Sequence, residues 1–275
     1  YTQPWDTIFC SPVAHIHEDE CNAPEFYAGG AKLTLVPGTD RMTPDALRNS
    51  IAGEQTRGVH GPQRGPVSIT QVTELGGVYT LAELQALTAV AREFDLPVHL
   101  DGARFANALV ALACTPAEMT WKAGVDIVSF GGTKNGCIGV EAVIFFDPSK
   151  AWEFELRRKR GAHLFSKHRF LSAQMAGYLS DNAWLDAARK ANANCAHLLK
   201  GLKANGATIL HPVDANIIFA TLPRAIHQKL QGGGAVYYVM DGDVATGDPD
   251  EQLTGRFVCD WSLSTNQVDQ FLSLF

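Results

Sequence analysis

The sequence predicts an α/β fold with a mostly parallel sheet, and three observations point to it. Two apolar runs with strand character, at 98–100 and 125–130, are separated by a helical stretch. Each run ends in polar residues, Asp101 after the first and Gly131-Gly132-Thr133-Lys134 after the second. Asp101 and Lys134 are 33 positions apart, about the length of one βαβ unit. Because ligands of open α/β sheets bind beyond the carboxyl ends of the strands, both side chains are expected at one rim.

Length and composition are those of a globular protein with a substantial core. The 275 residues include 46% apolar residues, enough for one large or two modest domains. The net charge of −6 and the pI of about 5.8 argue against a nucleic-acid or anionic-membrane surface. No apolar run approaches the roughly 20 residues of a membrane span. The six cysteines are scattered without a Cys-x-x-Cys pair, which argues against a zinc ribbon and predicts reduced thiols in a cytoplasmic protein.

The N-terminal third predicts alternating strands and helices. Strands are expected at 7–10, 32–36 and 66–72, a surface loop at 58–66, and helices from position 43 and over 80–94. Thr80-Leu-Ala-Glu83 is a capping box, in which the side chain of each end residue accepts a hydrogen bond from the backbone N–H of the other. The first strand starts so close to Tyr1 that upstream sequence is expected to be missing.

The remainder of the chain predicts an antiparallel return strand, a long helical region and a small C-terminal domain. A buried strand is expected at 140–146, helices from 147 to 204, and βαβ-like elements at 216–220, 225–230, 235–240, 255–259 and 264–275. We therefore divide the chain into a large domain at 1–155 and connecting helices with a small domain at 156–275. The basic run Arg157 to Arg160 invites a nucleic-acid interpretation, but the overall negative charge favours a solvated helix face or an anion site.

Asp101 and Lys134 together have the chemistry that pyridoxal 5'-phosphate (PLP) requires. A lysine forms a Schiff base with this cofactor, and an acid keeps its pyridine nitrogen protonated so that the ring accepts electrons. Glycines beside the lysine would let the backbone approach the cofactor closely. The alternative is structural: a surface lysine in a glycine-rich turn and an aspartate that caps the next helix.

A metal site is the second alternative. His15 and His17 alternate along the chain, and Glu20 follows, which resembles a set of metal ligands. Neither a third histidine nor a cysteine pair completes the set, so we predict no metal. A metal-dependent enzyme using His15, His17 and Glu20 remains a rival hypothesis.

Two motifs resemble the threonine aldolase family. They are His99-Leu-Asp101-Gly-Ala-Arg104 with Asn107-Ala108, and Ser129-Phe-Gly-Gly-Thr-Lys134-Asn-Gly. The resemblance implies a PLP-dependent lyase of fold type I, with a seven-stranded-type sheet covered on both faces and a small α/β domain. It also implies a homo-oligomer, dimer or tetramer, and a Gly-Thr-rich phosphate loop upstream of Tyr1. The large PLP-binding domain is therefore expected to be N-terminally incomplete.

The resemblance also implies roles for particular residues. His15 would stack on the PLP ring and is our candidate for the base that takes the β-hydroxyl proton. Arg104 would bind the phenolic oxygen of PLP, and Arg256 would bind the substrate carboxylate. Thr133 and Lys167 are assigned to cofactor binding, the latter at the phosphate of a neighbouring subunit. From the residues alone, the alternative for Arg104 is an exposed helix arginine, and the alternative for Arg256 is an outward-facing strand arginine.

The function implied is cleavage of L-threonine or L-allo-threonine to glycine and an aldehyde. Many members of the family carry a second histidine near the end of the strand at 66–72, where this sequence has Thr73-Glu74. A second histidine acid–base is therefore not expected. The alternatives are another PLP reaction of the same fold, β-elimination or transamination, or a chain that folds but does not catalyse.

Overall fold

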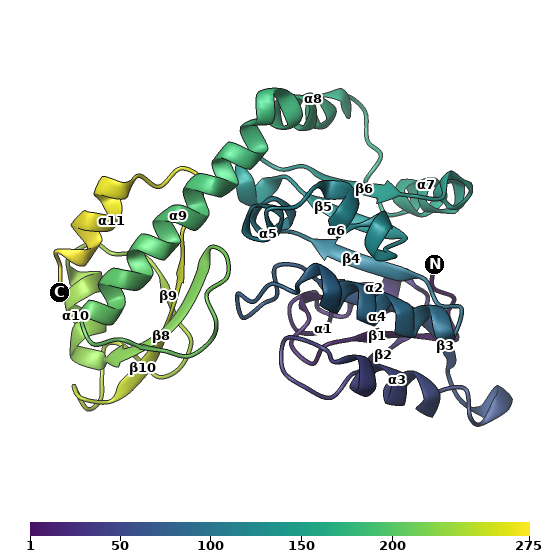
Figure 1. Cartoon of the computed structure of the whole chain (residues 1–275), viewed down its shortest axis with the longest axis horizontal. Helices are drawn as coiled ribbons and strands as arrows, with labels where there is room; N and C mark the ends of the chain where they lie inside the picture. The colour runs from purple at the N-terminus through teal and green to yellow at the C-terminus, as the bar shows by residue number, and fades with distance from the viewer.

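A computed structural model describes all 275 residues, Tyr1 to Phe275, and contains two sheets with separate hydrophobic cores (Figure 1). The first sheet has six strands in the order β2-β1-β3-β4-β5-β6. These strands are β1 (Asp6–Cys10), β2 (Lys32–Leu35), β3 (Gln63–Thr70), β4 (Val98–Gly102), β5 (Ile127–Gly131) and β6 (Glu141–Phe145). The pairs among β1 to β5 are parallel, and β6 returns antiparallel to β5. The predicted mostly parallel sheet and its antiparallel return are confirmed, with six strands in place of seven.

The third strand begins earlier than its sequence predicts. We expected 66–72 as strand and 58–66 as loop, but β3 starts at Gln63 and ends at Thr70. Gln63 and Arg64 pair with β1, and the register then shifts between Thr7 and Phe9. A Cβ on Gly65 would lie 2.6 Å from the carbonyl oxygen of Thr7, so only glycine fits there. The glycine and proline that suggested a loop mark an irregularity inside the strand.

Helices lie on both faces of the first sheet. They are α1 (His15–Glu18), α2 (Ala23–Tyr27), α3 (Pro44–Gly53), α4 (Leu81–Glu93), α5 (Phe105–Leu112), α6 (Pro116–Met119), α7 (Ala151–Arg160), α8 (Arg169–Leu179) and α9 (Ala183–Ala204). Short 3-10 turns occupy Gly58–His60, Trp121–Ala123, Thr133–Asn135, Pro148–Lys150 and Ser180–Asn182. The capping box predicted at Thr80 is present, with both of its hydrogen bonds.

Alternate residues of the central strands divide between the two faces. Val98 and Leu100 of β4 and Val128 of β5 belong to one buried cluster with side chains of α3, α4, α5 and α9. His99 and Asp101 of β4 point to the opposite face. On that face α7 packs against β6 through Phe154 and Phe145, whose ring centroids are 5.2 Å apart. The chemistry-bearing side chains thus project away from the main core.

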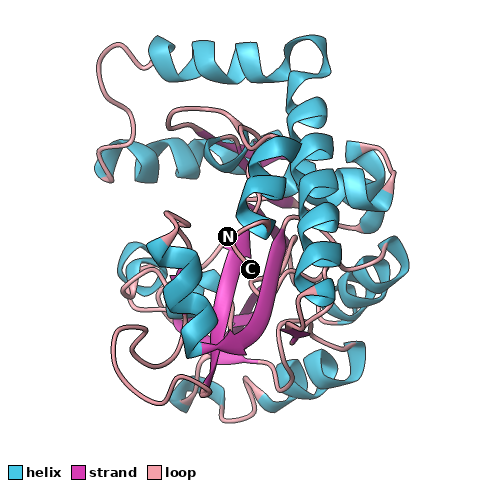
Figure 2. Cartoon of the chain, turned by 90° about the vertical axis from the view of Figure 1, so that its left-hand side faces the viewer, coloured by secondary structure: helices cyan, strands magenta, loops and turns pink.

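The second sheet is antiparallel throughout, which corrects the βαβ-like prediction. It has the order β7-β8-β10-β9, and Figure 2 looks onto it. Its elements are β7 (Thr208–Ile209), β8 (Ile217–Pro223), α10 (Arg224–Gly232), β9 (Tyr238–Val239), β10 (Gln252–Val258) and α11 (Thr265–Leu272). β9 has only two residues and lies at an edge, and β10 runs back beside β8. This reversal makes each pair antiparallel, whereas a βαβ crossover makes parallel pairs.

Helix α9 joins the two parts of the chain. Its first turns contribute Trp184 and Ala188 to the core of the first sheet. Its later turns contribute Cys195, Leu198 and Leu202 to the core of the second sheet. In Figure 1 it runs diagonally from the part of the chain with the first sheet to the part with the second sheet. No helix of the chain is both long enough and apolar enough to cross a membrane.

Candidate active site

Four neighbouring strands bring the candidate residues to one edge of the first sheet. His15 follows β1, Glu74 follows β3, Asp101 ends β4, and Lys134 follows β5. Since β1, β3, β4 and β5 are adjacent and parallel, their carboxyl ends share one rim. Asp101 and Lys134 therefore lie at the same rim, as predicted from the sequence.

Asp101 is held by the turn that leads into α5. Its Oδ1 accepts a hydrogen bond from the backbone N–H of Ala103 (3.1 Å). Two residues earlier, His99 lies between two serines, with Nδ1 2.9 Å from Ser68 Oγ and Nε2 2.9 Å from Ser129 Oγ. Removal from water lowers the pKa of His99, so its imidazole is neutral beneath Asp101.

Lys134 sits in a 3-10 turn that neighbouring side chains hold in place. The buried Asn135 amide donates to Tyr178 Oη (2.7 Å) and to the carbonyl oxygen of Trp184 (2.8 Å). Glu141 accepts from the backbone N–H groups of Gly132 (3.3 Å) and Thr133 (3.2 Å). These anchors were not predicted from the sequence, because Tyr178 and Trp184 are more than 40 positions away.

The hydroxyl of Thr133 closes the same turn. It donates to the carbonyl oxygen of Val140 (3.3 Å) and accepts from the Val140 N–H (3.1 Å). These bonds give Thr133 a structural task in the chain, while its assignment to cofactor binding stays a prediction.

The glycines before Lys134 allow neighbouring backbone segments of the protein to pack closely. A Cβ on Gly131 would lie 2.4 Å from the carbonyl oxygen of Ala103, and one on Gly132 would lie 2.7 Å from that of Val140. We expected these glycines to admit a cofactor, but they first allow the ends of β4 and β5 to approach. The same close packing fixes Asp101 and Lys134 relative to each other.

Three cations converge at the site without an ion-pair partner. Lys134, Arg104 and Arg256 are absent from the ion pairs of the chain. Removal from water, and then the nearby Arg256, lowers the pKa of Arg104 to about 10. Lys134 keeps contact with solvent, yet partial burial and then Arg104 lower the pKa of its ammonium group. Asp101 and Glu141 oppose this effect.

Arg256 reaches this site from the second sheet. It lies on β10 next to Phe257, which belongs to the small core, so the alternation of side chains along the strand directs Arg256 away from that core. Its charge acts on both Arg104 and Lys134, so it faces the first sheet. The role of Arg256 at the site, against the alternative of an outward-facing strand arginine, stays a prediction.

His15 and Glu74 form the other side of the rim. Glu74 Oε1 accepts from the backbone N–H of His15 (2.7 Å) and from Thr70 Oγ1 (2.9 Å). The imidazole of His15 contacts Glu20, with Nδ1 2.8 Å from Oε1. Thr73 points elsewhere, with its hydroxyl 2.5 Å from Asp40 Oδ2. Of the pair Thr73-Glu74, only the glutamate belongs to the site.

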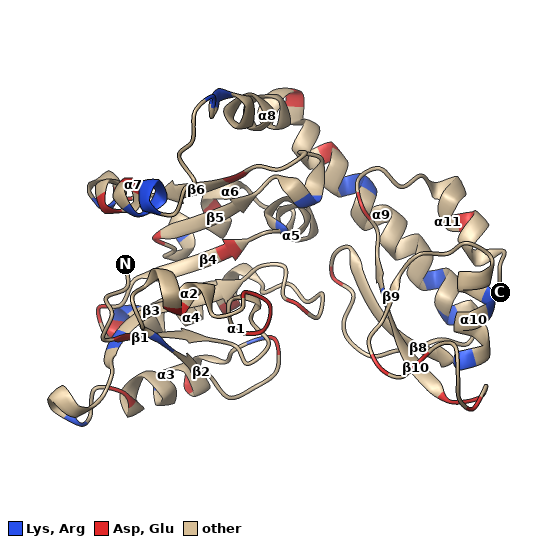
Figure 3. Ribbon diagram, turned by 180° about the vertical axis from the view of Figure 1, so that it is seen from behind, with Lys and Arg blue, Asp and Glu red and all other residues tan.

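Two further sets of candidate residues remain: Lys167, assigned to a neighbouring subunit, and His15, His17 and Glu20 of the rival metal hypothesis. Lys167 lies between α7 and α8 with φ at 64°, and its ammonium makes no hydrogen bond to the other candidates. His15, His17 and Glu20 are not arranged as a group that could hold a metal ion. His17 pairs with Glu18 (3.4 Å) instead. The basic run of α7 is partly neutralised by acids of the same helix, as Figure 3 shows, with Arg157 bonded to Glu153.

The candidate residues fit PLP. Arg104 Nε is buried without a hydrogen-bond partner, a donor that an anionic phenolic oxygen would satisfy. Unpaired cations suit the phosphate and the substrate carboxylate, and Asp101 supplies the acid for the ring nitrogen. Lys134, with its lowered pKa, supplies the amine.

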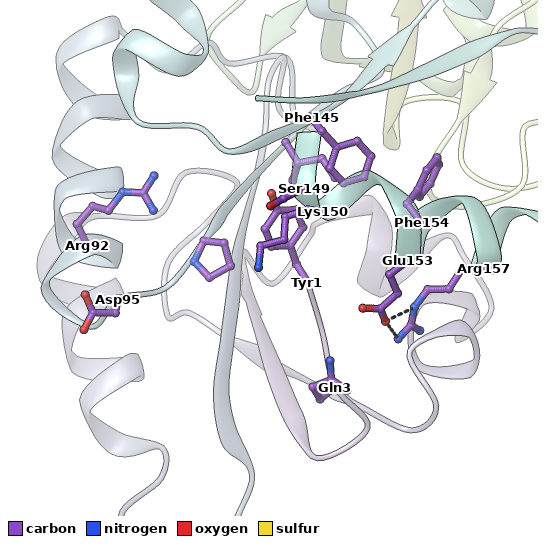
Figure 4. Close-up of a pocket in the computed structure, with 12 residues that line it drawn as sticks. Tyr1, Gln3, Arg92, Asp95, Phe145, Ser149, Lys150, Glu153, Phe154 and Arg157 are labelled. Atoms are coloured by element: carbon purple, nitrogen blue, oxygen red, sulfur yellow. Dashed lines mark hydrogen bonds and ion pairs between the residues drawn. The ribbon is translucent and has the colours of Figure 1, made fainter. Parts of the chain in front are cut away.

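A separate cavity lies away from this rim. It measures about 630 Å³ and is lined by residues including Tyr1, Arg92, Lys150 and Glu153 (Figure 4). Neither Asp101 nor Lys134 lines it. Its position near Pro97 and Ile127, at the starts of β4 and β5, puts it at the opposite end of the strands.

Comparison with known proteins gives a consistent result. The family model described as beta-eliminating lyase matches residues 1–225. A low specificity L-threonine aldolase of Pseudomonas sp. (strain NCIMB 10558) is 41% identical over 97% of this chain and 74% of its own length. The Pseudomonas aeruginosa enzyme of the same name is 40% identical, with the same coverage.

Solved structures show the same similarity. The Leishmania major threonine aldolase matches with a TM-score of 0.87 and 25% identity, covering 99% of this chain and 77% of its own. A Sphingomonas wittichii serine palmitoyltransferase matches with a TM-score of 0.65 and 16% identity, covering 100% of this chain and 66% of its own. The second match, at low identity, bears on the fold alone.

Proposed function

Because the chain belongs to the beta-eliminating lyase family, and within it to the threonine aldolases, we propose that it cleaves L-threonine and L-allo-threonine to glycine and an aldehyde. It is a PLP-dependent lyase of fold type I. The main support for this site is that Asp101 and Lys134 lie near the unpaired cations Arg104 and Arg256.

Four residues would hold the cofactor and substrate. We assign Lys134 as the covalent anchor of PLP, Asp101 as the partner of the ring nitrogen, and Arg104 as the donor to the phenolic oxygen. Bound PLP supplies an electron sink for the pair released at Cα when the Cα–Cβ bond breaks. The lowered pKa of Lys134 raises the fraction of neutral, nucleophilic amine near neutral pH.

Arg256 is assigned to the substrate carboxylate. A guanidinium can hold a carboxylate through two parallel hydrogen bonds, which fixes orientation as well as position. Because Arg256 comes from the second sheet, it would hold the substrate between the two bodies, with the bond to be broken set against the cofactor plane. His15 would lie over the cofactor, where its contact with Glu20 fixes the imidazole orientation.

The cofactor assignment is tested by labelling. The chain is incubated with PLP, reduced with borohydride, digested, and mapped by mass spectrometry. We expect the label on Lys134, and Lys134→Ala should remove both the label and turnover. Threonine and serine assays scored for aldehyde, pyruvate and ammonia separate aldol cleavage from β-elimination and transamination. Full activity in Lys134→Ala, or label on another lysine, would refute the site.

We also propose a homo-oligomer, dimer or tetramer, that works in the cytoplasm. Exposed aromatic side chains support an interface, with Trp152 71% and Phe170 62% accessible on α7 and α8. Lys167 lies between these two helices, and its nearness to their exposed aromatic residues supports its proposed contribution to a neighbouring subunit's phosphate site. The six free cysteines suit a reducing compartment. Light scattering of the purified protein tests the assembly, and a monomer at micromolar concentration would refute it.

A further inference from the structure

One carboxylate oxygen in the site has no partner. Glu74 Oε2 is buried and accepts no hydrogen bond, whereas Oε1 of the same group accepts two. A buried oxygen without a donor lowers the stability of the protein, because it has lost its hydrogen bonds to water and has formed none in their place. Such an atom at the rim of a site points to a ligand that brings the missing donor.

The neighbours of Glu74 are residues of the candidate site. Oε1 is fixed by the His15 N–H from the side of β1 and by the Thr70 hydroxyl at the end of β3. From the side of β4, the charges of Asp101 and Arg104 act on the group. Glu74 therefore stands between the residue assigned to the ring nitrogen and the residue assigned to stacking on the ring.

The neighbouring candidate for proton transfer, His15, uses only one of its two ring nitrogens in the chain. His15 makes its hydrogen bond through Nδ1 to Glu20, a half-exposed side chain at the surface. A second histidine is absent from the segment after β3, where Thr73 is turned toward Asp40. The substrate of the proposed reaction carries a β-hydroxyl group, which is a hydrogen-bond donor and must lose its proton. Glu74 Oε2 is the vacant acceptor that matches it.

We propose that Glu74 is a catalytic residue that binds the β-hydroxyl group of the substrate through Oε2 and accepts its proton. This inference rests on the function proposed above. The O–H pair becomes the second bond of the aldehyde carbonyl, and the Cα–Cβ bond breaks with its electron pair remaining on Cα. Glu74 passes the proton it has taken to solvent, and a proton from solvent completes glycine at Cα, so atoms and charge balance.

The electrostatics of Glu74 suit this role. Burial raises the pKa of its carboxyl group, and the nearby Asp101 acts in the same direction, against the hydrogen bonds that favour the ionised form. The charged and titratable groups facing it are Arg104 and Asp101 from the β4 side, Cys10 from β1, and Tyr79 from the following loop. A base with a raised pKa is closer to the working pH and transfers protons more efficiently.

The test is the variant Glu74→Gln. Glutamine keeps an oxygen for the His15 N–H and Thr70, but its amide nitrogen replaces the oxygen that would accept the hydroxyl proton. We expect kcat/KM for L-threonine to fall about 100-fold or more, the usual contribution of a general base. Exchange of the glycine α-proton with deuterated solvent, followed by proton NMR, should continue at the unsubstituted rate, because glycine has no β-hydroxyl.

Glu18→Gln is the matched control. It removes an equal charge from α1, where Glu18 is 55% exposed and pairs only with His17, and it should leave both rates unchanged. If Glu74→Gln retains threonine cleavage, the proposal is wrong. If it loses glycine exchange as well, Glu74 serves the cofactor or the fold, and the proposal is again wrong.

A second measurement does not depend on the variant or on turnover. In the PLP-free protein with ¹³C-labelled glutamate, we expect the Glu74 carboxyl resonance to titrate above the ordinary glutamate range. Titration at or below that range would overturn the proposal. Failure of the proposed function is distinguishable, because it would appear in the unsubstituted chain as the absence of a PLP label on Lys134.

Discussion

Asn135→Ala should destabilise the protein and release the turn that carries Lys134. The amide is 4% exposed and donates to Tyr178 Oη and to the Trp184 carbonyl oxygen. Each bond contributes about 1 kcal/mol net, and the cavity left by the buried amide costs about 1 kcal/mol more. We therefore expect a loss of about 3 kcal/mol, or roughly two powers of ten in the folding equilibrium constant.

Urea unfolding of the PLP-free protein measures this loss. With a denaturant slope of about 3 kcal/mol/M, the midpoint should fall by about 1 M. Tryptophan fluorescence is a suitable probe, since Trp184 lies beside Asn135. Asn49→Ala, an exposed position in the middle of α3, is the control and should shift stability by less than about 0.5 kcal/mol. A loss below about 1 kcal/mol in Asn135→Ala would refute the reasoning.

Two further predictions follow from the same rim. Gly131→Ala should destabilise by about 3 kcal/mol or prevent folding, because its Cβ would lie 2.4 Å from a backbone oxygen that cannot rotate away. Gly139→Ala, where a Cβ meets nothing within 4 Å, is its control in the same urea assay. Arg104→Met should raise the pKa of Lys134, because the cation beside it no longer disfavours the ammonium. In the PLP-free protein, the pH midpoint for acetylation of Lys134 by acetic anhydride should then rise, and an unchanged or lower midpoint would contradict the charge argument.

The sequence predicted the core of the site because local signals sufficed there. Asp101 and Lys134 each follow an apolar run, and parallel strands place both at one rim by geometry. Asn135 could not be found in this way, since its partners lie on α8 and α9. Glu74 lies four residues beyond β3, and only the folded chain shows that one of its oxygens lacks a partner.

The second sheet was the least accurate part of the prediction. The short β7 was not predicted, while the other strand and helix positions were close. Strand direction depends on the course of the 240–251 loop, which hydrophobic periodicity does not indicate. The division of the chain at 155/156 stays a prediction. Tyr178 and Trp184, beyond that point, pack into the core of the first sheet because their rings meet Phe130 of β5.

The passage of α9 from one core to the other has a mechanical consequence. Within one turn, Asn192 bonds to Asn107 of α5, and Asn194 bonds to the carbonyl oxygen of Leu263 and to the hydroxyl of Thr265. Helix α9 is thus hydrogen-bonded, within one turn, to both parts of the chain that carry the two sheets. Asp214, ahead of β8, joins the two parts a second time, because its Oδ2 accepts from the Val78 N–H (3.0 Å) and its own N–H donates to the carbonyl oxygen of Gly76 (3.4 Å). With two separate attachments, the position of Arg256 relative to Lys134 is fixed for as long as these hydrogen bonds persist.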